Sequence, residues 1–228
     1  MASDVVDKPS LSKIDSIIFD LDGTIIDSQQ SIIDSLKWSL KKAGIDPAVN
    51  LTRDLIGPPL VDTLIKISRK SDMRLLGELV DGFKARYDSL GYKGGKPFLG
   101  METAIRQLHH IGYKLYVATN KRLVPTQKIM THFSLGEYFE SVYSIDLRMN
   151  SPFKNKSQMI ESLIADHNMD PSRTIYVGDR IEDHQAACAN NIGCFLVGWG
   201  YGAEAGELAG YSLVDNPKDL SVRVGQLN

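Results

Sequence analysis

Three pairs of polar side chains lie at spacings that could support chemistry, and each pair follows a short apolar run. The pairs are Asp20 and Asp22 after SIIF, Thr119 and Asn120 after YVA, and Asp179 and Asp183 after TIYVG. Four carboxylates gathered in one partly dehydrated site repel one another, so they either take up protons or are held by a cation. Mg²⁺ suits such a site because it takes oxygen ligands and leaves positions for water and a substrate phosphate. If the three runs are neighbours in one sheet, the acids indicate a magnesium site.

A magnesium ion beside a carboxylate favours phosphoryl chemistry. One Asp oxygen can attack phosphorus and form an aspartyl-phosphate, while a second carboxylate acts first as general acid and then as base. Asp22 lies two residues after Asp20, and a turn of the chain at Gly23 would bring it over the leaving oxygen. The hydroxyl and backbone amides at Thr119 and Asn120 would bind phosphoryl oxygens, and a lysine would balance the remaining charge. Each feature alone is more often a turn or a solvated acid pair, so the interpretation depends on their combination.

Buried strands alternating with amphipathic helices must position these residues. The apolar runs that predict strands are Ile17–Phe19, Leu115–Ala118, Val142–Ile145, Thr174–Val177 and Cys194–Val197. The segments that predict helices are Met101–Ile111, Leu123–Phe133, Lys156–Asp166 and Glu182–Asn190. Short runs without polar alternation are typical of strands buried on both faces. Strand and helix in alternation predict an α/β fold with a doubly wound parallel sheet, and its ligands are expected at the carboxyl ends of the strands.

One interval, 28–96, shows only helical patterns and interrupts this alternation. We expect an α/β core domain over 14–27 and 97–228, a helical domain over 28–96, and a flexible lead-in over 1–13. The junctions near Asp27-Ser28 and near Gly94–Pro97 are candidate hinges. The sequence leaves two interpretations open: a domain that closes over the strand ends, or a rigid helical extension of the core.

Composition excludes several classes of function. The 228 residues are 43% hydrophobic and 24% charged, with a formal net charge of -2, which predicts a globular protein with a substantial core. The sequence has no stripe of basic residues, so we expect no nucleic-acid partner. It also has no run of about 18 apolar residues, so we expect no membrane span. We expect Cys188 and Cys194 to be reduced thiols and the protein to be cytoplasmic, because neither metal-ligand spacing nor a signal sequence is apparent. Monomer and homodimer both remain open.

Four motifs in order resemble the signature of the haloacid dehalogenase superfamily. They read FDLDGT, VATN, FKNK and VGDRIED, and the resemblance runs from about Ser16 to the C-terminus. The helical insert, the segment LIGPPL and the later GWGYG are similar to the phosphoglycolate phosphatase-like branch, which has an α-helical C1 cap. The resemblance implies a Rossmann-like core with an inserted all-helical cap.

The resemblance also implies roles for the polar residues at the strand ends. Asp20 would be the nucleophile and Asp22 the general acid and base. Thr119 and the backbone of Asn120 would bind the phosphoryl group. The metal ligands would be the side chain of Asp20, the backbone carbonyl of Asp22, and Asp179, with Asp183 holding the water shell or binding directly.

The catalytic and phosphate-binding lysine has two candidates, Lys154 and Lys156. Many relatives carry Lys-Pro-x-Pro before the following helix, whereas this chain has Pro152-Phe153-Lys154-Asn155-Lys156. Lys156 begins the apolar helical stripe and matches the helix-start lysine of relatives that lack the proline pair. We therefore favour Lys156 and expect Lys154 to be a solvated surface residue.

The function implied is that of a phosphoric monoester hydrolase. We expect a Mg²⁺-dependent phosphatase that hydrolyses a small, phosphoglycolate-like metabolite through an aspartyl-phosphate. One alternative is a phosphomutase resembling β-phosphoglucomutase, although such relatives often have Asp-Gly-Val where this chain has Asp22-Gly23-Thr24. A catalytically silent binding module on the same fold is the second alternative. The substrate itself is not apparent from the sequence.

Overall fold

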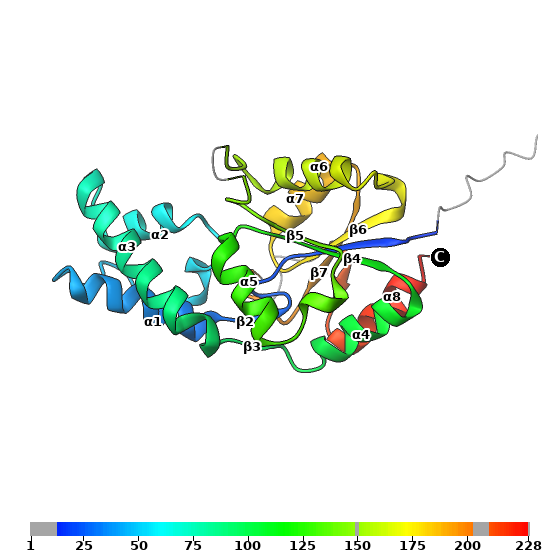
Figure 1. Ribbon diagram of the computed structural model, residues 1–228, viewed down its shortest axis with the longest axis horizontal. Helices are drawn as coiled ribbons and strands as arrows, with labels where there is room; N and C mark the ends of the chain where they lie inside the picture. Colours follow the sequence, from blue (N-terminus) through cyan, green and yellow to red (C-terminus); the bar gives the residue numbers. More distant parts are fainter. Residues whose placement is uncertain (1–12, 149–150, 203–209, 228) are drawn as a thin grey trace, which may run out of the picture.

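The larger part of the molecule is built on one parallel sheet (Figure 1). The computed structural model describes residues 13–148, 151–202 and 210–227. The strands are β1 (Ser16–Phe19), β4 (Lys114–Thr119), β5 (Ser141–Ser144), β6 (Thr174–Gly178), β7 (Gly193–Val197) and β8 (Leu213–Val214). They lie in the order β5-β4-β1-β6-β7-β8, and every neighbouring pair is parallel. This confirms the predicted α/β fold.

Helices cover both faces of the sheet. On one side lie α4 (Met101–Ile111), α5 (Leu123–His132) and α8 (Leu220–Gly225), and on the other α6 (Lys156–Asp166) and α7 (Ile181–Ala189). Because side chains alternate along a strand, Ile17 and Phe19 pack into the first layer while Ile18 packs into the second. All three are fully buried, as expected for a central strand covered on both faces.

The second part of the molecule consists of three helices beyond one end of the sheet (Figure 1). They are α1 (Gln29–Lys42), α2 (Leu60–Ser68) and α3 (Met73–Ser89). They surround a separate apolar core that includes Leu40, Leu64 and Leu79. We call residues 28–96 the cap. Two short antiparallel strands, β2 (Ile26–Asp27) and β3 (Lys96–Pro97), place the two connections to the cap side by side.

Short 3-10 helices complete the described secondary structure. They are Arg53–Leu55, Gly91–Gly94, Gly136–Tyr138, Pro171–Arg173 and Pro217–Asp219. Among the helices of residues 13–148, 151–202 and 210–227, none is both long and apolar enough to cross a membrane.

We predict that Leu64→Ala destabilises the protein by about 2–5 kcal/mol, because Leu64 is fully buried in the cap core and its truncation leaves a cavity. Urea unfolding measures the loss. Ile65→Ala is the matched control, because the Ile65 side chain follows Leu64 on α2 and is 39% exposed. This variant should lower the free energy of unfolding by less than about 1 kcal/mol. Equal losses for the two variants would contradict this account of the cap.

Candidate active site

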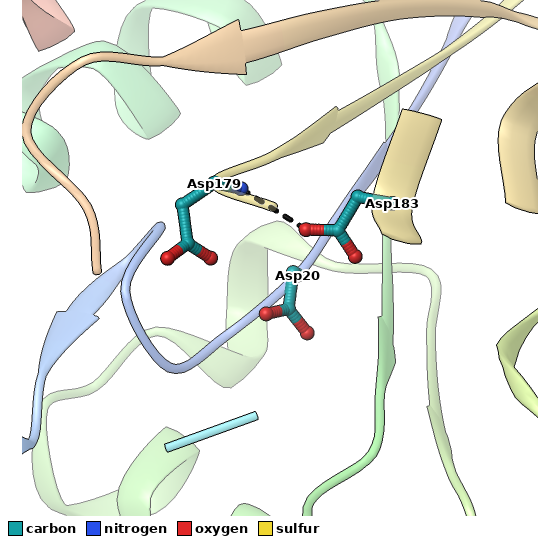
Figure 2. A group of neighbouring side chains, drawn as sticks. All are labelled: Asp20, Asp179 and Asp183. Atoms are coloured by element: carbon teal, nitrogen blue, oxygen red, sulfur yellow. Dashed lines mark hydrogen bonds between the residues drawn. The ribbon is translucent and has the colours of Figure 1, made fainter. Parts of the chain in front are cut away.

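Three aspartates meet at the carboxyl ends of β1 and β6 (Figure 2). Asp20 follows β1, Asp179 follows β6, and Asp183 lies in the first turn of α7. One oxygen from each carboxylate lies within 4.8 Å of the others. All three residues are buried, with Asp179 and Asp183 each 1% exposed. The fold therefore brings together three of the four acids singled out in the sequence.

Strand pairing and a glycine turn create this cluster. β1 and β6 are neighbours, and the Asp20 amide continues their ladder by donating to the Val177 carbonyl at 2.9 Å. Gly23 then turns the chain with φ +90°, a conformation that favours glycine. A Cβ at Gly23 would lie only 2.4 Å from Oδ2 of Asp179. Gly23 thus provides the turn and also leaves space for the carboxylate of Asp179.

Burial and mutual repulsion raise the affinity of the cluster for protons. Burial raises the pKa of Asp20 to about 6, against a lowering effect of Lys156 and with a further raising effect of Asp183. Burial also raises the pKa of Asp179 to about 7, and the charges of Asp183 and Asp20 add to that shift. Without a cation, the ionised cluster is therefore unfavourable.

The oxygen donors of the cluster fit a hard divalent cation. Among the described residues, no group has hydrogen-bond geometry to the buried Oδ1 of Asp20, although Nζ of Lys156 lies 3.1 Å away. Oδ2 of Asp179 accepts the amides of Tyr201, at 2.7 Å, and Gly202, at 3.2 Å. These bonds orient the Asp179 carboxylate. A buried ligand set made only of oxygen atoms suits Mg²⁺.

Lys156, and not Lys154, reaches the cluster. Its Nζ lies 2.5 Å from Oδ1 of Asp183 and 3.1 Å from Oδ1 of Asp20. Burial alone would lower the pKa of Lys156, but the charges of Asp183 and Asp20 raise it well above its ordinary value, so the ammonium stays charged. The α6 N-cap, Asn155, fixes the start of the helix by accepting the Gln158 amide at 2.9 Å. Lys154 is exposed.

Asp22 does not point into the cluster but is held by a lysine that the sequence interpretation missed. Nζ of Lys121 lies 2.8 Å from Oδ2 of Asp22, and the Ser28 hydroxyl donates to Oδ1 at 2.6 Å. Lys121 is largely buried, and its Nζ lies 4.4 Å from the ring centroid of Tyr87 in the cap. These contacts hold the Asp22 carboxylate near the junction with the cap. The only sequence signal was a lysine directly after Asn120.

Thr119 and Asn120 occupy the end of β4, next to β1 in the sheet. Thr119 is 2% exposed and lines the same cavity as Asp20. The Asn120 side chain turns toward the cap, where its amide donates to the Gly57 carbonyl at 3.3 Å. The sequence analysis assigned a role only to the Asn120 backbone. The contact of its side chain with the cap was not predicted.

Asp20, Asp22 and Asp183 line a cavity of about 310 Å³ between core and cap. The core contributes Asp20, Asp22, Thr119, Asn120, Lys121, Arg122, Pro125, Lys156, Arg180, Glu182 and Asp183, and the cap contributes Ile32, Leu36, Leu55, Ile56, Gly57, Pro58, Pro59, Leu60, Thr63, Phe83 and Tyr87. Arg180 donates from its guanidinium to the Ile56 carbonyl in the cap. Arg122 forms a bidentate ion pair with Asp88 of the cap.

The loop Gly198–Gly202 ties the cluster to the cap junction. Its Tyr201 backbone binds Asp179, while its hydroxyl accepts the amides of Ser28, at 2.6 Å, and Gln29, at 3.0 Å. The same hydroxyl lies 3.0 Å from a carboxylate oxygen of Asp27 and can donate to it. Tyr201 therefore contacts both a candidate metal ligand, Asp179, and the junction with the cap near Asp27 and Ser28.

Cys188 and Cys194 are free thiols, as expected.

Comparisons with known proteins agree with this geometry. The family described as haloacid dehalogenase-like hydrolase matches residues 17–197. A 5'-nucleotidase of Pseudomonas aeruginosa is 30% identical over 190 residues, covering 83% of this chain and 85% of the relative. A phosphoglycolate phosphatase of Vibrio vulnificus is 27% identical over 205 residues, covering 86% and 87%. A predicted phosphatase from Clostridium acetobutylicum has a similar crystal structure, with a TM-score of 0.83, 28% identity, and coverage of 94% of this chain and 100% of the other.

We predict that Lys156→Ala lowers kcat by about 100-fold or more, because it removes the cation beside Asp20 and Asp183. Lys154→Ala is the matched control two residues away and should leave kcat within about twofold, since its side chain is exposed. Steady-state phosphate release by the two purified variants measures both effects. The reverse pattern would assign the role to Lys154.

We predict that Mg²⁺ raises the melting temperature more at about pH 8 than at about pH 5. The folded-state pKa values of Asp20 and Asp179, about 6 and about 7, lie above the ordinary 3.8. The metal-free protein therefore loses stability as the pH rises from 3.8, and the loss is complete once both folded carboxyls ionise, at about 6 to 7. Mg²⁺ binds the ionised oxygens and offsets that loss, whereas protons compete with it at the lower pH. Thermal unfolding in excess Mg²⁺ and in chelator measures the gain at each pH. The gain should disappear in Asp179→Asn, and a larger gain at the lower pH would contradict the assignment.

Proposed function

Because the chain belongs to the haloacid dehalogenase-like hydrolases, we propose that it is a Mg²⁺-dependent phosphatase that acts on a small phosphorylated metabolite through an aspartyl-phosphate on Asp20. The observation that carries the proposal is that Asp20 and Asp183 of the buried carboxylate cluster, with Lys156, lie in the wall of a cavity between core and cap. Such a cavity can hold a phosphate monoester against a nucleophile and a cation while limiting access of bulk water.

The metal would be held by the side chains of Asp20 and Asp179, by the backbone carbonyl of Asp22, and by Asp183 directly or through water. When bound, Mg²⁺ would neutralise charge on the phosphoryl oxygens and keep the Asp20 carboxylate ionised. Lys156 would contact the phosphoryl oxygens from the side of Asp183, and the hydroxyl of Thr119 and the amide of Asn120 would bind them from the end of β4.

The reaction would proceed in two displacements at phosphorus. An Asp20 carboxylate oxygen attacks phosphorus, the ester P–O bond breaks, and the leaving oxygen takes a proton from Asp22. Water then attacks the aspartyl-phosphate and gives a proton to Asp22, while the P–O bond to Asp20 breaks and releases inorganic phosphate. Ser28 and Lys121, which contact both Asp22 oxygens, would aim this carboxyl group at the leaving oxygen.

The cap, residues 28–96, would act as a domain that opens for substrate and closes for chemistry. The paired connections β2 and β3 support this because they form a narrow joint between the two parts. Polar contacts across the cavity, between Arg122 and Asp88 and between Arg180 and Ile56, would hold the closed form.

The phosphomutase alternative would require the phosphoryl group to return to a second hydroxyl instead of water. Thr24 follows Gly23 in this chain, and its hydroxyl lies 3.4 Å from Oδ1 of Asp179. The threonine disfavours this alternative, because phosphomutases resembling this chain often have Asp-Gly-Val at these positions. A silent binding module is disfavoured because acid, nucleophile and lysine positions are all filled.

We predict that the purified chain releases phosphate from p-nitrophenyl phosphate in Mg²⁺ and that chelator abolishes the release. Asp20→Asn should lower kcat by about 1,000-fold or more, because the amide cannot form the aspartyl-phosphate. A colorimetric phosphate assay measures both effects, and circular dichroism confirms that the variant is folded. Release that persists in the folded Asp20→Asn variant would exclude the proposed mechanism, and transfer to an added alcohol without net release would favour a mutase.

A further inference from the structure

The cap side of the cavity is apolar. Its side chains come mainly from Ile32, Leu36, Leu55, Ile56, Leu60, Phe83 and Tyr87, with Thr63 and three glycine or proline residues completing the wall. None of the cap residues in the cavity wall is ionisable to a cation or a carboxylate, and all of residues 28–96 are described. Lys66 of the cap pairs instead with Asp54 at the surface, where both side chains are more than half exposed. The leaving group of a bound substrate would therefore face hydrocarbon.

The cations on the core side of the cavity already have partners. Lys121 is paired with Asp22, and Arg122 with Asp88. Lys156 lies between Asp20 and Asp183, where the transferring phosphoryl group would use it. Glu182, also in the wall, would repel an anion.

Arg180, the remaining cation of the wall, is held against the cap backbone. It donates to the Ile56 carbonyl, and its guanidinium packs so closely on Gly57 that a Cβ there would lie 2.5 Å from Nε. The Ile56 carbonyl takes one N–H group of this guanidinium, so a second anionic group could pair with Arg180 only at this edge of the cap. Placed against the apolar side chains of the cap, such a group would be buried without a partner, which is strongly unfavourable.

The cap offers neutral recognition instead. Phe83 and Tyr87 are stacked, with ring centroids 5.5 Å apart and planes 6° apart, and both line the cavity. The Tyr87 hydroxyl is buried on the side of the ring system where Lys121 packs, with Nζ of Lys121 4.4 Å from the ring centroid. An aromatic wall with one neutral hydroxyl suits a ring that carries at most uncharged polar groups.

We propose that the substrate is a phosphate monoester whose alcohol is uncharged and presents a ring to the cap, and not an ester whose leaving group carries a second anion. This inference depends on the proposed phosphatase function and narrows its substrate class. It disfavours the phosphoglycolate-like substrate expected from the sequence, whose leaving group has a carboxylate. Two kinds of leaving group are uncharged alcohols that carry a ring: a nucleoside, and a simple aryl or cyclic alcohol.

The test compares two substrates that differ by one charge, phenyl phosphate and 4-carboxyphenyl phosphate. With the full chain in Mg²⁺, kcat/KM should be at least about tenfold higher for phenyl phosphate, since burying the unpaired carboxylate costs more than one order of magnitude in rate. The carboxylate makes the phenol a slightly better leaving group, so chemistry without the cavity would give the opposite preference. A ratio near one, or a preference for the charged substrate, would overturn the inference.

A cation placed in the cap should reduce that preference. Leu60→Arg adds a guanidinium to the half-buried rim of the cavity and should lower the phenyl to carboxyphenyl ratio at least about threefold. Val61→Arg is the matched control, because its side chain is 42% exposed on the same helix and does not line the cavity, and it should leave the ratio unchanged. Equal ratios in both variants would contradict the assigned role of the cap wall. The wild-type ratio remains a test even if Leu60→Arg does not fold.

Two further substrates distinguish a nucleoside from a simple ring alcohol. They also distinguish a failure of the substrate inference from a failure of the proposed phosphatase function. A nucleoside 5′-monophosphate and phosphoglycolate are assayed beside the phenyl pair. A faster nucleotide assigns a nucleoside, a faster phenyl phosphate assigns a simple ring alcohol, and a faster phosphoglycolate overturns the inference while keeping the phosphatase. No Mg²⁺-dependent release from any of the four would instead overturn the proposed function.

Discussion

The burial of three carboxylates at one point is the constraint on which the rest of this structure depends. Asp20, Asp179 and Asp183 share a small volume with one ammonium, that of Lys156. Their mutual repulsion is tolerable only because backbone amides and the lysine hold individual oxygens, and because protons or a cation can neutralise the remainder. The parallel sheet, the Gly23 turn and the N-terminus of α7 all serve to keep these oxygens in place. A site built this way is ready to bind a divalent cation and the anionic substrate that the cation attracts.

The proposed general acid, Asp22, is held by different elements than the proposed nucleophile, Asp20. Asp20 is fixed by the sheet, whereas Asp22 is held by Ser28 at the start of the cap and by Lys121, which packs on the ring of Tyr87. The position of Asp22 therefore depends on how the cap sits on the core. In the proposed mechanism, this arrangement would link proton transfer to closure, so that the leaving group would be protonated when the cavity is shut. Tyr201 strengthens the link because it contacts both Asp179 and the amides at the junction.

The sequence predicted the framework well because that framework depends on local signals. The five predicted strands and four predicted helices of the core agree with the structure to within about two residues, since apolar runs and capping residues are readable locally. The two-residue β8 and six-residue α8 were missed because such short elements have no measurable periodicity. Lys121 was missed for another reason. Its partner, Asp22, lies 99 positions away, and only the fold makes them neighbours. The roles assigned to the individual aspartates and to Lys156 stay predictions.

The cap wall joins specificity to stability. Leu36, Leu55, Phe83 and Tyr87 line the cavity and also belong to the apolar core of the cap. A charged or polar replacement at any of them would alter the cavity but would also remove apolar contacts that hold α1, α2 and α3 together. Leu60, at the rim, is only half-buried and packs at the edge of this core, so its replacement removes fewer apolar contacts. Changes in leaving-group preference are therefore expected first at the rim, while the catalytic carboxylates and the deep wall of the cap remain unchanged.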